Sequence, residues 1–449
     1  MSSFSITQGR NIKIKGAADK RIVDVVLPKT VALVIDDLRG ITSKVLVNPG
    51  DIVKAGTALV MDKNHEDIKL VAPVAGKVLS VNRGEKRVLM NIVIETAAAQ
   101  ESVLFARYEP ADLSQLSREA VMKQLFKGGL WPCLRQRPFS KIANPKDKPK
   151  SVFIHAMNTE PLAADVDFVL EGCQDEFQAG VDVIRKLTDG KIHLCIDPAA
   201  KSKALTQAKG VEIHTFTGAH PAGNVGTHIH CVDPVNKGEL VWFIEAQDVL
   251  RVAKLFLKGI HTAERIVAVT GEGVQKRIYV KTVAGAPIAG LLEGSDLQKS
   301  RCISGSILTG RNVGKDGFLG FYDSQITLIP EGGTREFLGW LSPGFNRYTF
   351  SNTYISSFLG RKESSLDTDT HGAHRAIVMG YLYDDFVALD VMTFFLVRAI
   401  IVGDVEEAVS LGILECDEED FALCSFACPS KTDVGSYIRQ GLNLVESEG

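Results

Sequence analysis

The stretch FKGGLWPCLRQRPF, residues 126–139, divides this chain of 449 residues into two kinds of sequence. Short β-strand patterns precede it, and strands alternate with helices from Ser151 onward. Paired glycines let a backbone approach a flat ligand closely, aromatic side chains offer faces for stacking, and arginine offers a planar fork for phosphate, carboxylate or carbonyl oxygen. The candidate binding residues are Gly128, Gly129, Trp131, Arg135, Arg137 and Phe139.

A structural explanation of the same stretch stays open. A helix that starts near Asp112 can end at Gly128, and a proline-stiffened connection then follows. Under this explanation Arg135 and Arg137 pair with acidic side chains across a domain or subunit boundary. The stretch would then join parts of the fold and would bind no ligand.

Length, charge and cysteine content limit the class of protein. A chain of this length forms roughly two to four domains. The net charge of −3 gives no general attraction to nucleic acid. The most apolar run, residues 386–402, contains Asp390 and Arg398 and so predicts a buried helix rather than a membrane span. The 8 cysteines follow no apolar secretory signal, so we expect reduced thiols and a cytoplasmic location.

Residues 1–100 are predicted to form a small β domain. β-branched runs bounded by turn residues occur at 31–35, 44–47 and 88–94. Its central segments resemble the barrel-sandwich hybrid of biotinyl and lipoyl carrier domains, in which a turn lysine holds the prosthetic group. Lys63 follows Asp62 and is the corresponding candidate, but the polar loop after it is long, which favours a solvated lysine.

Residues 101–270 are predicted to form a Rossmann-like α/β domain with an N-terminal linker helix. Alternation of strands and helices at this spacing predicts a parallel, doubly wound sheet with its ligand crevice at the carboxyl ends of the strands. No GxGxxG fingerprint follows the first strand, so no dinucleotide site is indicated. The predicted strands are 152–155, 192–196, 211–214, 241–244 and 265–269, and the predicted helices are 176–187 and 246–258.

A glycine-rich segment with several histidines, residues 218–231, lies within this domain. If it is extended, His228 and His230 point the same way and can share a metal. A third ligand would have to be His220, Cys231 or Glu245. The alternative is a close-packed turn with hydrogen-bonded histidines, and on ligand count we expect no metal site.

The remaining chain divides into two parts. Residues 271–330 return to strand patterns and are predicted to form a β-grasp-like (SLBB-like) module, and residues 331–449 are predicted to be a helical C-terminal domain. Cys424 and Cys428-Pro429 have the spacing of the end of a ferredoxin-type iron–sulfur motif, with Cys416 more distant. A cluster needs four thiolates, so buried structural thiols are the expected state.

Several motifs in one order carry a family resemblance along the whole chain. They are IKIKG (12–16), APVAGKV (72–78), NRGEKRVL (82–89), GGLWPCLRQRPF (128–139), HPAG (220–223) and EEDFALCSFACP (418–429). Together they resemble the A subunit of the bacterial sodium-translocating NADH:quinone oxidoreductase. The architecture is also distantly similar to the flavin-binding subunit of complex I and the C subunit of the Rnf complex.

The resemblance implies a peripheral subunit on the cytoplasmic face of the bacterial inner membrane. Its partners would be five other subunits, some of them integral membrane proteins, and the complex would couple NADH oxidation and ubiquinone reduction to sodium export. Flavins and 2Fe-2S would lie on the partner subunits. This chain would contribute to quinone interaction and assembly, would hold no tightly bound cofactor and would be inactive alone. The candidate binding residues of the stretch 128–139 suit a quinone, since aromatic rings can stack on its headgroup and guanidinium groups can donate to its carbonyl oxygens.

Two other interpretations remain. A self-standing flavin or NADH dehydrogenase would require the missing GxGxxG fingerprint and a longer glycine loop. A purely structural scaffold, derived from a flavin- and iron–sulfur-binding fold that has lost its cofactors, shares the shortened loop and the incomplete cysteine set with the quinone-interacting subunit. The sequence alone does not separate the scaffold from that subunit.

Overall fold

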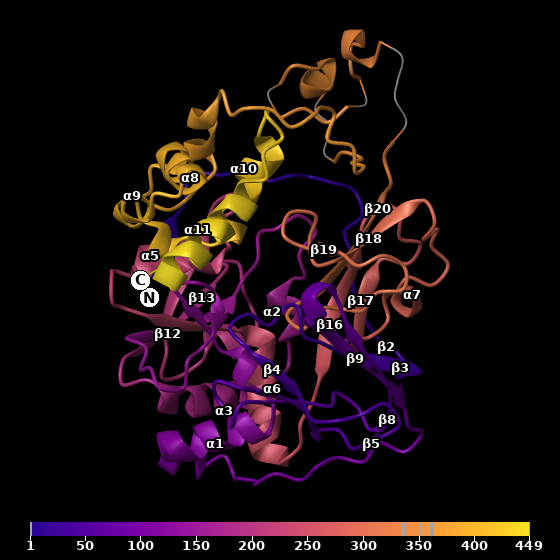
Figure 1. Cartoon of the computed structure of the whole chain (residues 1–449), viewed down its shortest axis with the longest axis vertical. Coiled ribbons are helices and arrows are strands. Elements are labelled where there is room, and N and C mark those ends of the chain that lie inside the picture. The colour runs from indigo at the N-terminus through magenta and orange to yellow at the C-terminus, as the bar shows by residue number, and fades with distance from the viewer. Residues whose placement is uncertain (1, 334–337, 346, 351, 360–362, 449) are drawn as a thin grey trace.

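The computed structural model describes residues 2–333, 338–345, 347–350, 352–359 and 363–448, which form several sheets and a group of helices (Figure 1). The largest sheet has seven strands in the order β1-β14-β13-β12-β15-β10-β11. These strands are β1 (Ser2–Ser5), β10 (Arg135–Arg137), β11 (Lys141–Ile142), β12 (Ser151–Ala156), β13 (Lys191–Ile196), β14 (Glu212–Thr217) and β15 (Val241–Glu245).

A six-stranded sheet has the order β19-β18-β20-β16-β17-β2. Its strands are β2 (Asp19–Asp24), β16 (Glu264–Thr270), β17 (Ile278–Val283), β18 (Ser300–Ser304), β19 (Arg311–Asn312) and β20 (Gln325–Pro330). Two smaller sheets, β3-β9-β8-β5 and β4-β6-β7, form the N-terminal unit. Their strands are β3 (Thr30–Val34), β4 (Ser43–Val45), β5 (Ile52–Val53), β6 (Ala58–Asp62), β7 (Lys69–Val71), β8 (Gly76–Arg83) and β9 (Leu89–Thr96).

The α-helices of the described residues come after the N-terminal sheets along the chain. The α-helices are α1 (Arg118–Lys127), α2 (Val166–Val169), α3 (Gln174–Ile184), α4 (Lys203–Thr206), α5 (Val225–Val232), α6 (Ala246–Lys258), α7 (Ile288–Leu291), α8 (Thr393–Val402), α9 (Val405–Ser410), α10 (Ala422–Ala427) and α11 (Val434–Glu448). The 3-10 turns are η1 (Glu85–Arg87), η2 (Leu113–Gln115), η3 (Trp131–Cys133), η4 (Arg185–Leu187), η5 (Gly339–Leu341), η6 (Ile355–Leu359), η7 (Gly380–Asp385), η8 (Ile413–Glu415) and η9 (Glu418–Phe421). Among the described residues, no helix has both the length and the apolar character needed to cross a membrane.

The central sheet is buried on both faces, which explains its nearly continuous apolar strands. Strands β14, β13, β12 and β15 run parallel in that order, so the chain reverses its direction of winding between β12 and β15. Val152 and Ile154 pack with α3 and α6, whereas Phe153 packs with α5 on the other face. The ligand crevice of such a sheet lies at the carboxyl ends of β12 and β15, where His155 and Glu245 stand.

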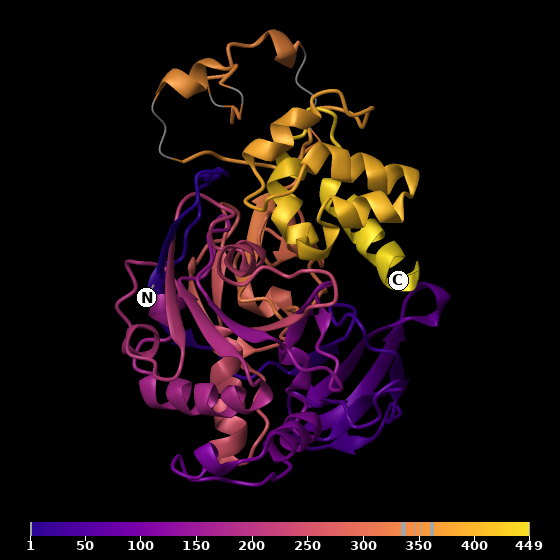
Figure 2. The same ribbon diagram turned by 90° about the vertical axis from the view of Figure 1, so that its left-hand side faces the viewer.

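The N-terminal segment connects units that are far apart in sequence. Strand β1 pairs in parallel with β14, and β2 pairs in parallel with β17. Between them, Ile12 and Ile14 are buried in the core of the C-terminal helices. In Figures 1 and 2 those helices (yellow) lie above the central sheet, and the N-terminal sheets (indigo to purple) lie beside it at the lower right. The predicted 1–100 domain thus begins with strands that belong to other sheets.

Several predicted helices differ in extent from the structure. The helix expected from Asp112 begins at Arg118, because the Ser117 hydroxyl accepts a hydrogen bond from the Ala120 amide and caps it. The apolar run 386–402 is helical only from Thr393, as α8. The predicted helix 246–258 coincides with α6.

Close packing of α3 on α6 gives a first test. A Cβ added to Gly180 on α3 would overlap the carbonyl of Val249 on α6, whereas Gly290 on α7 has open space around it. We expect Gly180→Ala to lower the free energy of unfolding by about 1–3 kcal/mol, because a backbone atom cannot move aside as a flexible side chain can. Gly290→Ala is the matched control and should be neutral or stabilising by up to ~1 kcal/mol. Urea unfolding of the purified chain measures both, and equal effects would contradict the packing.

Candidate functional site

The paired glycines lie where the N-terminal unit meets the α/β unit. Helix α1 ends at Lys127, and Gly129 has a φ of 68°, a conformation that favours glycine. A Cβ at Gly129 would stand 2.5 Å from the Val71 side chain, and one at Gly128 would overlap Leu255 on α6. The chain passes between the two units here because neither position carries a side chain.

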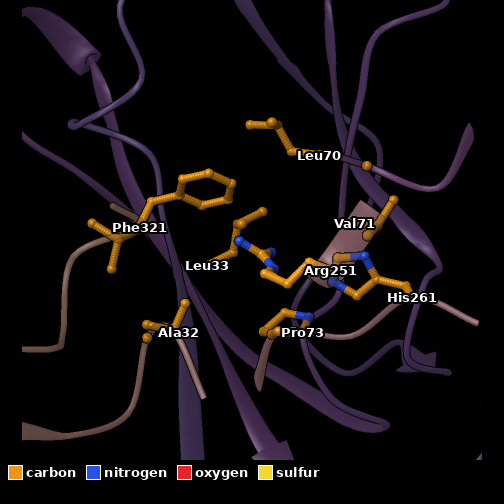
Figure 3. Close-up of a pocket in the computed structure, with 13 residues that line it drawn as sticks. Ala32, Leu33, Leu70, Val71, Pro73, Arg251, His261 and Phe321 are labelled. Carbon is orange, nitrogen blue, oxygen red and sulfur yellow. The ribbon is translucent and has the colours of Figure 1, made fainter. Parts of the chain in front are cut away.

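Beside Gly129 lies a small cavity, which we call the interdomain pocket (Figure 3). Its volume of about 20 Å³ holds roughly one water molecule. Its lining comes from the N-terminal sheets and their loops, from Gly129, from α6 and its following loop, and from loops that connect strands of the six-stranded sheet. The lining residues are Ala32, Leu33, Val34, Leu70, Val71, Pro73, Gly129, Arg251, His261, Ala263, Ala284, Gly285 and Phe321.

Two polar side chains face this otherwise apolar pocket. The Arg251 guanidinium is buried, donates to Asp248 Oδ1 at 2.8 Å and to the Thr262 carbonyl at 3.0 Å, and lies 5.3 Å from the centre of the Phe321 ring. His261 lies beside Arg251 (Figure 3). Its Nδ1 is 2.8 Å from the Gly128 carbonyl. A carbonyl only accepts, so Nδ1 carries the proton and Nε2 is the acceptor.

The charge of each polar group in the pocket follows from its surroundings. Burial and the nearby Arg251 lower the pKa of His261 to about 3, so the imidazole is neutral at pH 7. Arg251 is held in place by Asp248, whose Oδ1 also accepts from Arg265 Nη2 at 2.7 Å. The pocket therefore offers a fixed cation, a neutral acceptor and an aromatic ring.

Trp131 lies within the core and is not part of the pocket lining. Its side chain is fully buried, its indole N–H donates to the Ala143 carbonyl at 2.7 Å, and its ring packs edge-on against Phe126 and Trp242. Of the six residues singled out in the sequence, Gly129 alone is part of the pocket lining. Their proposed contact with quinone stays a prediction.

Arg135 stands in a charged chain at the carboxyl end of the central sheet. Its guanidinium donates to Glu245 Oε1 at 2.8 Å and lies 4.4 Å from the ring centres of both Phe243 and Tyr322. Glu245 Oε2 is 2.9 Å from His155 Nδ1. The crevice expected at this edge thus contains an Arg–Glu–His chain.

His155 is doubly protonated in this arrangement. Its Nε2 is 2.6 Å from the Gly223 carbonyl and its Nδ1 faces the Glu245 carboxylate, so both partners only accept. Burial opposes the charge, but the Glu245 carboxylate outweighs it and raises the pKa of His155 to about 9. Burial of Glu245 acts to raise the pKa of its carboxyl group, but the neighbouring His155 outweighs this effect and lowers that pKa to about 2.

Arg137 is buried among carboxylates of the C-terminal region. Its side chain is 1% exposed, and its guanidinium lies 2.8 Å from Glu419, 3.2 Å from Asp420 and 3.5 Å from Asp417. Asp417 also pairs with Arg439, which donates to the Phe139 carbonyl at 2.8 Å. These contacts are ion pairs across a domain boundary, as the structural explanation of the stretch requires.

The other candidate residues from the sequence lie in separate parts of the structure. Lys63 is exposed in the loop between β6 and β7. His228 and His230 lie on α5 rather than on an extended segment, so the expected common direction is wrong: two residues apart on a helix, they point to different sides. His228 is fully buried and faces the Ala222 carbonyl, whereas His230 pairs with Glu415.

The three C-terminal cysteines are buried free thiols. Cys416 contacts the Gly412 carbonyl, Cys424 contacts the Tyr383 carbonyl, and Cys428 lies 3.0 Å from the Tyr383 hydroxyl. All three sulfurs thus contribute to the core of the C-terminal helices.

Comparison with known proteins gives matches along the whole chain. Three family models match: the NqrA N-terminal barrel-sandwich hybrid domain at residues 4–97, the NqrA second alpha/beta domain at 116–261 and the NQRA C-terminal domain at 266–315. The A subunit of the Na(+)-translocating NADH-quinone reductase of Yersinia pseudotuberculosis is 40% identical, with 99% of this chain and 100% of the relative covered. This chain belongs to the NqrA family.

Other members of the family give the same result. The corresponding subunits of Alcanivorax borkumensis and of Neisseria meningitidis serogroup A are each 39% identical, with 99% of this chain and 100% of each relative covered. An NAD+-reducing [NiFe]-hydrogenase structure covers 52% of each chain at 14% identity, but its TM-score of 0.33 is too low to bear on the fold. The resemblance inferred from the motifs and the multidomain α/β class are confirmed, while the Rossmann-like and β-grasp-like assignments stay predictions.

The buried ion pairs of Arg137 give a stability prediction. Arg137→Ala leaves the buried Asp420 carboxylate without its cation, so we expect a loss of about 3–5 kcal/mol in the free energy of unfolding. Arg301→Ala is the matched control, because Arg301 and Glu331 pair on the surface and such pairs contribute about 0–1 kcal/mol. Denaturant unfolding measures both, and a small effect of Arg137→Ala would refute the buried cluster.

The charge of His155 predicts a pH dependence. The pKa of His155 is raised from 6.5 to about 9. Its contribution to folding stability is therefore fully present below about pH 6.5 and is lost as the pH rises through 9. We expect the free energy of unfolding of the wild type to exceed that of His155→Gln by about 1–3 kcal/mol at pH 6. This difference should shrink as the pH rises toward 10. Denaturant unfolding measured between pH 6 and pH 10 checks this prediction. The control is His374→Gln, at an exposed position, which should show no such pH-dependent difference from wild type. A difference that does not change with pH would exclude an imidazolium at position 155.

Proposed function

We propose that this chain is a peripheral subunit of a respiratory complex that couples NADH oxidation and ubiquinone reduction to sodium export. The observation that carries this proposal is its match over essentially full length to relatives named as the A subunit of a Na(+)-translocating NADH-quinone reductase. The proposal includes five partner subunits, attachment at the cytoplasmic face of the membrane, and flavin and 2Fe-2S groups on the partners. The chain itself contributes to quinone interaction and assembly without a tightly bound cofactor.

The interdomain pocket supports the quinone part of the proposal. A quinone has a flat apolar ring and two carbonyl oxygens, and the pocket offers apolar walls, the Phe321 ring and the Arg251 guanidinium. Arg251 can donate to a carbonyl oxygen, and the neutral Nε2 of His261 can accept from the hydroxyl of the reduced quinol. Arg251 and His261 can thus form hydrogen bonds with both the quinone and the quinol.

The size of the pocket sets a condition on this role. A cavity of about 20 Å³ does not admit a quinone ring, so the walls must part by a shift of Phe321 or of the N-terminal sheets. Those walls come from separate units, and shifts between packed units are a common route to an open site. Gly129 permits close approach of the ring, while Gly128, Trp131, Arg135, Arg137 and Phe139 hold the loop in position.

A purely structural scaffold is the second candidate. The small volume of the cavity and the internal pairing of Arg135 and Arg137 favour it. Under this alternative the chain organises its partners and has no contact with quinone. Both candidates predict loss of assembly when the core is damaged, so only variants that assemble normally can separate them.

Arg251 and Arg265 provide a matched pair of variants for this purpose. Both are buried and donate to the same Asp248 oxygen, but only Arg251 lines the pocket. In the purified, fully assembled complex, Arg251→Lys should raise the KM for quinone about 10-fold or more, because a charge-assisted hydrogen bond contributes about 1.5–3 kcal/mol. Arg265→Lys should leave it unchanged, and NADH oxidation with an artificial acceptor should persist in both. Equal KM values in the two assembled variants would favour the scaffold.

A further inference from the structure

A cluster of three potential metal ligands lies at the far edge of the central sheet, apart from the interdomain pocket. His193 is on β13, and Glu212 and His214 are on the neighbouring strand β14. His193 and Glu212 are register partners in this parallel pair, and His214 follows Glu212 by two residues. Because side chains alternate between the faces of a strand, all three project from the same face.

The ligand atoms already stand close to the spacing that a tetrahedral site needs. His193 Nδ1 is 3.0 Å from His214 Nε2 and 3.7 Å from Glu212 Oε2, and all three ligand atoms lie within 4.8 Å of one another. With zinc–nitrogen and zinc–oxygen bonds of about 2.0–2.2 Å, the edges of a tetrahedron are about 3.3–3.5 Å long. The observed distances of 3.0 and 3.7 Å lie on either side of this value, so small side-chain rotations would bring the three ligand atoms to tetrahedral spacing.

The surroundings suit a metal with an accessible coordination position. Both imidazoles are buried, whereas the Glu212 side chain is 47% exposed, so an ion can enter from solvent. Imidazole binds a metal in its neutral form, and each of the two buried rings offers one nitrogen to the cluster. His214 Nδ1 is buried without a hydrogen-bond partner, and it is free to carry the proton when Nε2 binds a metal.

We propose that His193, Glu212 and His214 bind one Zn²⁺ ion, with solvent in the fourth position. Two histidines and one glutamate are an established zinc ligand set. The ion would join β13 to β14 next to the edge strand β1, where Ser2 is the register partner of His214. It would fasten the edge of the sheet and would not take part in electron transfer, because Zn²⁺ has no redox chemistry.

The competing explanation is a structural network without metal. One imidazole N–H can donate to the other ring, and Lys191 pairs with Glu212 Oε1 at 2.7 Å. The Lys191 side chain is 67% exposed, so its ammonium can move into solvent when a cation enters. The two explanations predict opposite effects of Lys191: it competes with a metal but stabilises the metal-free network.

Metal titration of the full chain separates these explanations. After removal of metals with a chelator, we expect one Zn²⁺ per chain by competition with a chromogenic chelator, and Co²⁺ should give the absorption bands of tetrahedral coordination. Glu212→Gln should weaken Zn²⁺ binding more than ~10-fold, since loss of an outer-shell partner alone costs about 10–100-fold. His193→Ala should abolish the Co²⁺ bands.

Two further variants complete the test. Lys191→Gln should tighten Zn²⁺ binding several-fold by removing the competing cation, and His374→Ala, at an exposed position, should bind as wild type does. Glu212 is at the surface, so its variant should fold even if His193→Ala does not. No stoichiometric Zn²⁺ in wild type, or Zn²⁺ binding that is unchanged by Glu212→Gln, would overturn the proposal.

Discussion

The close passage of Gly128 and Gly129 between two units is the constraint on which the rest of the structure depends. On one side lies Val71 of the N-terminal sheets, and on the other lies Leu255 of α6. A side chain at either position would force the two units apart, because overpacked cores relax only at a cost. The single apolar core that spans both units exists because this loop has no side chains at the crossing.

The same loop fixes the polar groups on both sides of it. The Gly128 carbonyl sets the tautomer of His261 in the interdomain pocket. The following strand β10 then places Arg135 against Glu245 and Arg137 against the carboxylates before α10. Phe321 lines the pocket, while the next residue, Tyr322, covers Arg135. One loop and the strand after it thus contact both the pocket and the charged chain at the sheet edge.

Local patterns predicted much of this architecture, and long-range pairing accounts for what they missed. The amphipathic periodicity of α6 and the β-branched runs of β12 and β13 identified those elements from sequence. Strand β10 was missed because Arg135–Arg137 has no strand pattern of its own and is held by pairing with β15. Strands β1 and β2 pair with β14 and β17, which lie far along the chain, and local spacing cannot show such pairing.

The residues of the candidate site were likewise predicted only in part from the sequence. The glycine pair was recognised because its backbone freedom is a property of residue type, but Arg251 and His261 carry no local signal and reach the pocket only through the fold. Glu212 and His214 have the two-residue spacing of a strand face, yet His193 joins them only when β13 and β14 are neighbours. Sequence therefore located the loop, and tertiary structure supplied its partners.

Hydrogen exchange of the backbone amides in the assembled complex, with and without a short-chain quinone, tests the central claim most directly. If the interdomain pocket receives the ring, quinone should slow exchange in segments 31–34 and 69–73 of the N-terminal unit and in segment 259–263 after α6, because all three contribute to the pocket lining. Exchange in β10 and β11, which lie outside the pocket lining, should stay unchanged. Unaltered exchange in all three pocket segments, or protection confined to residues 135–142, would contradict the account.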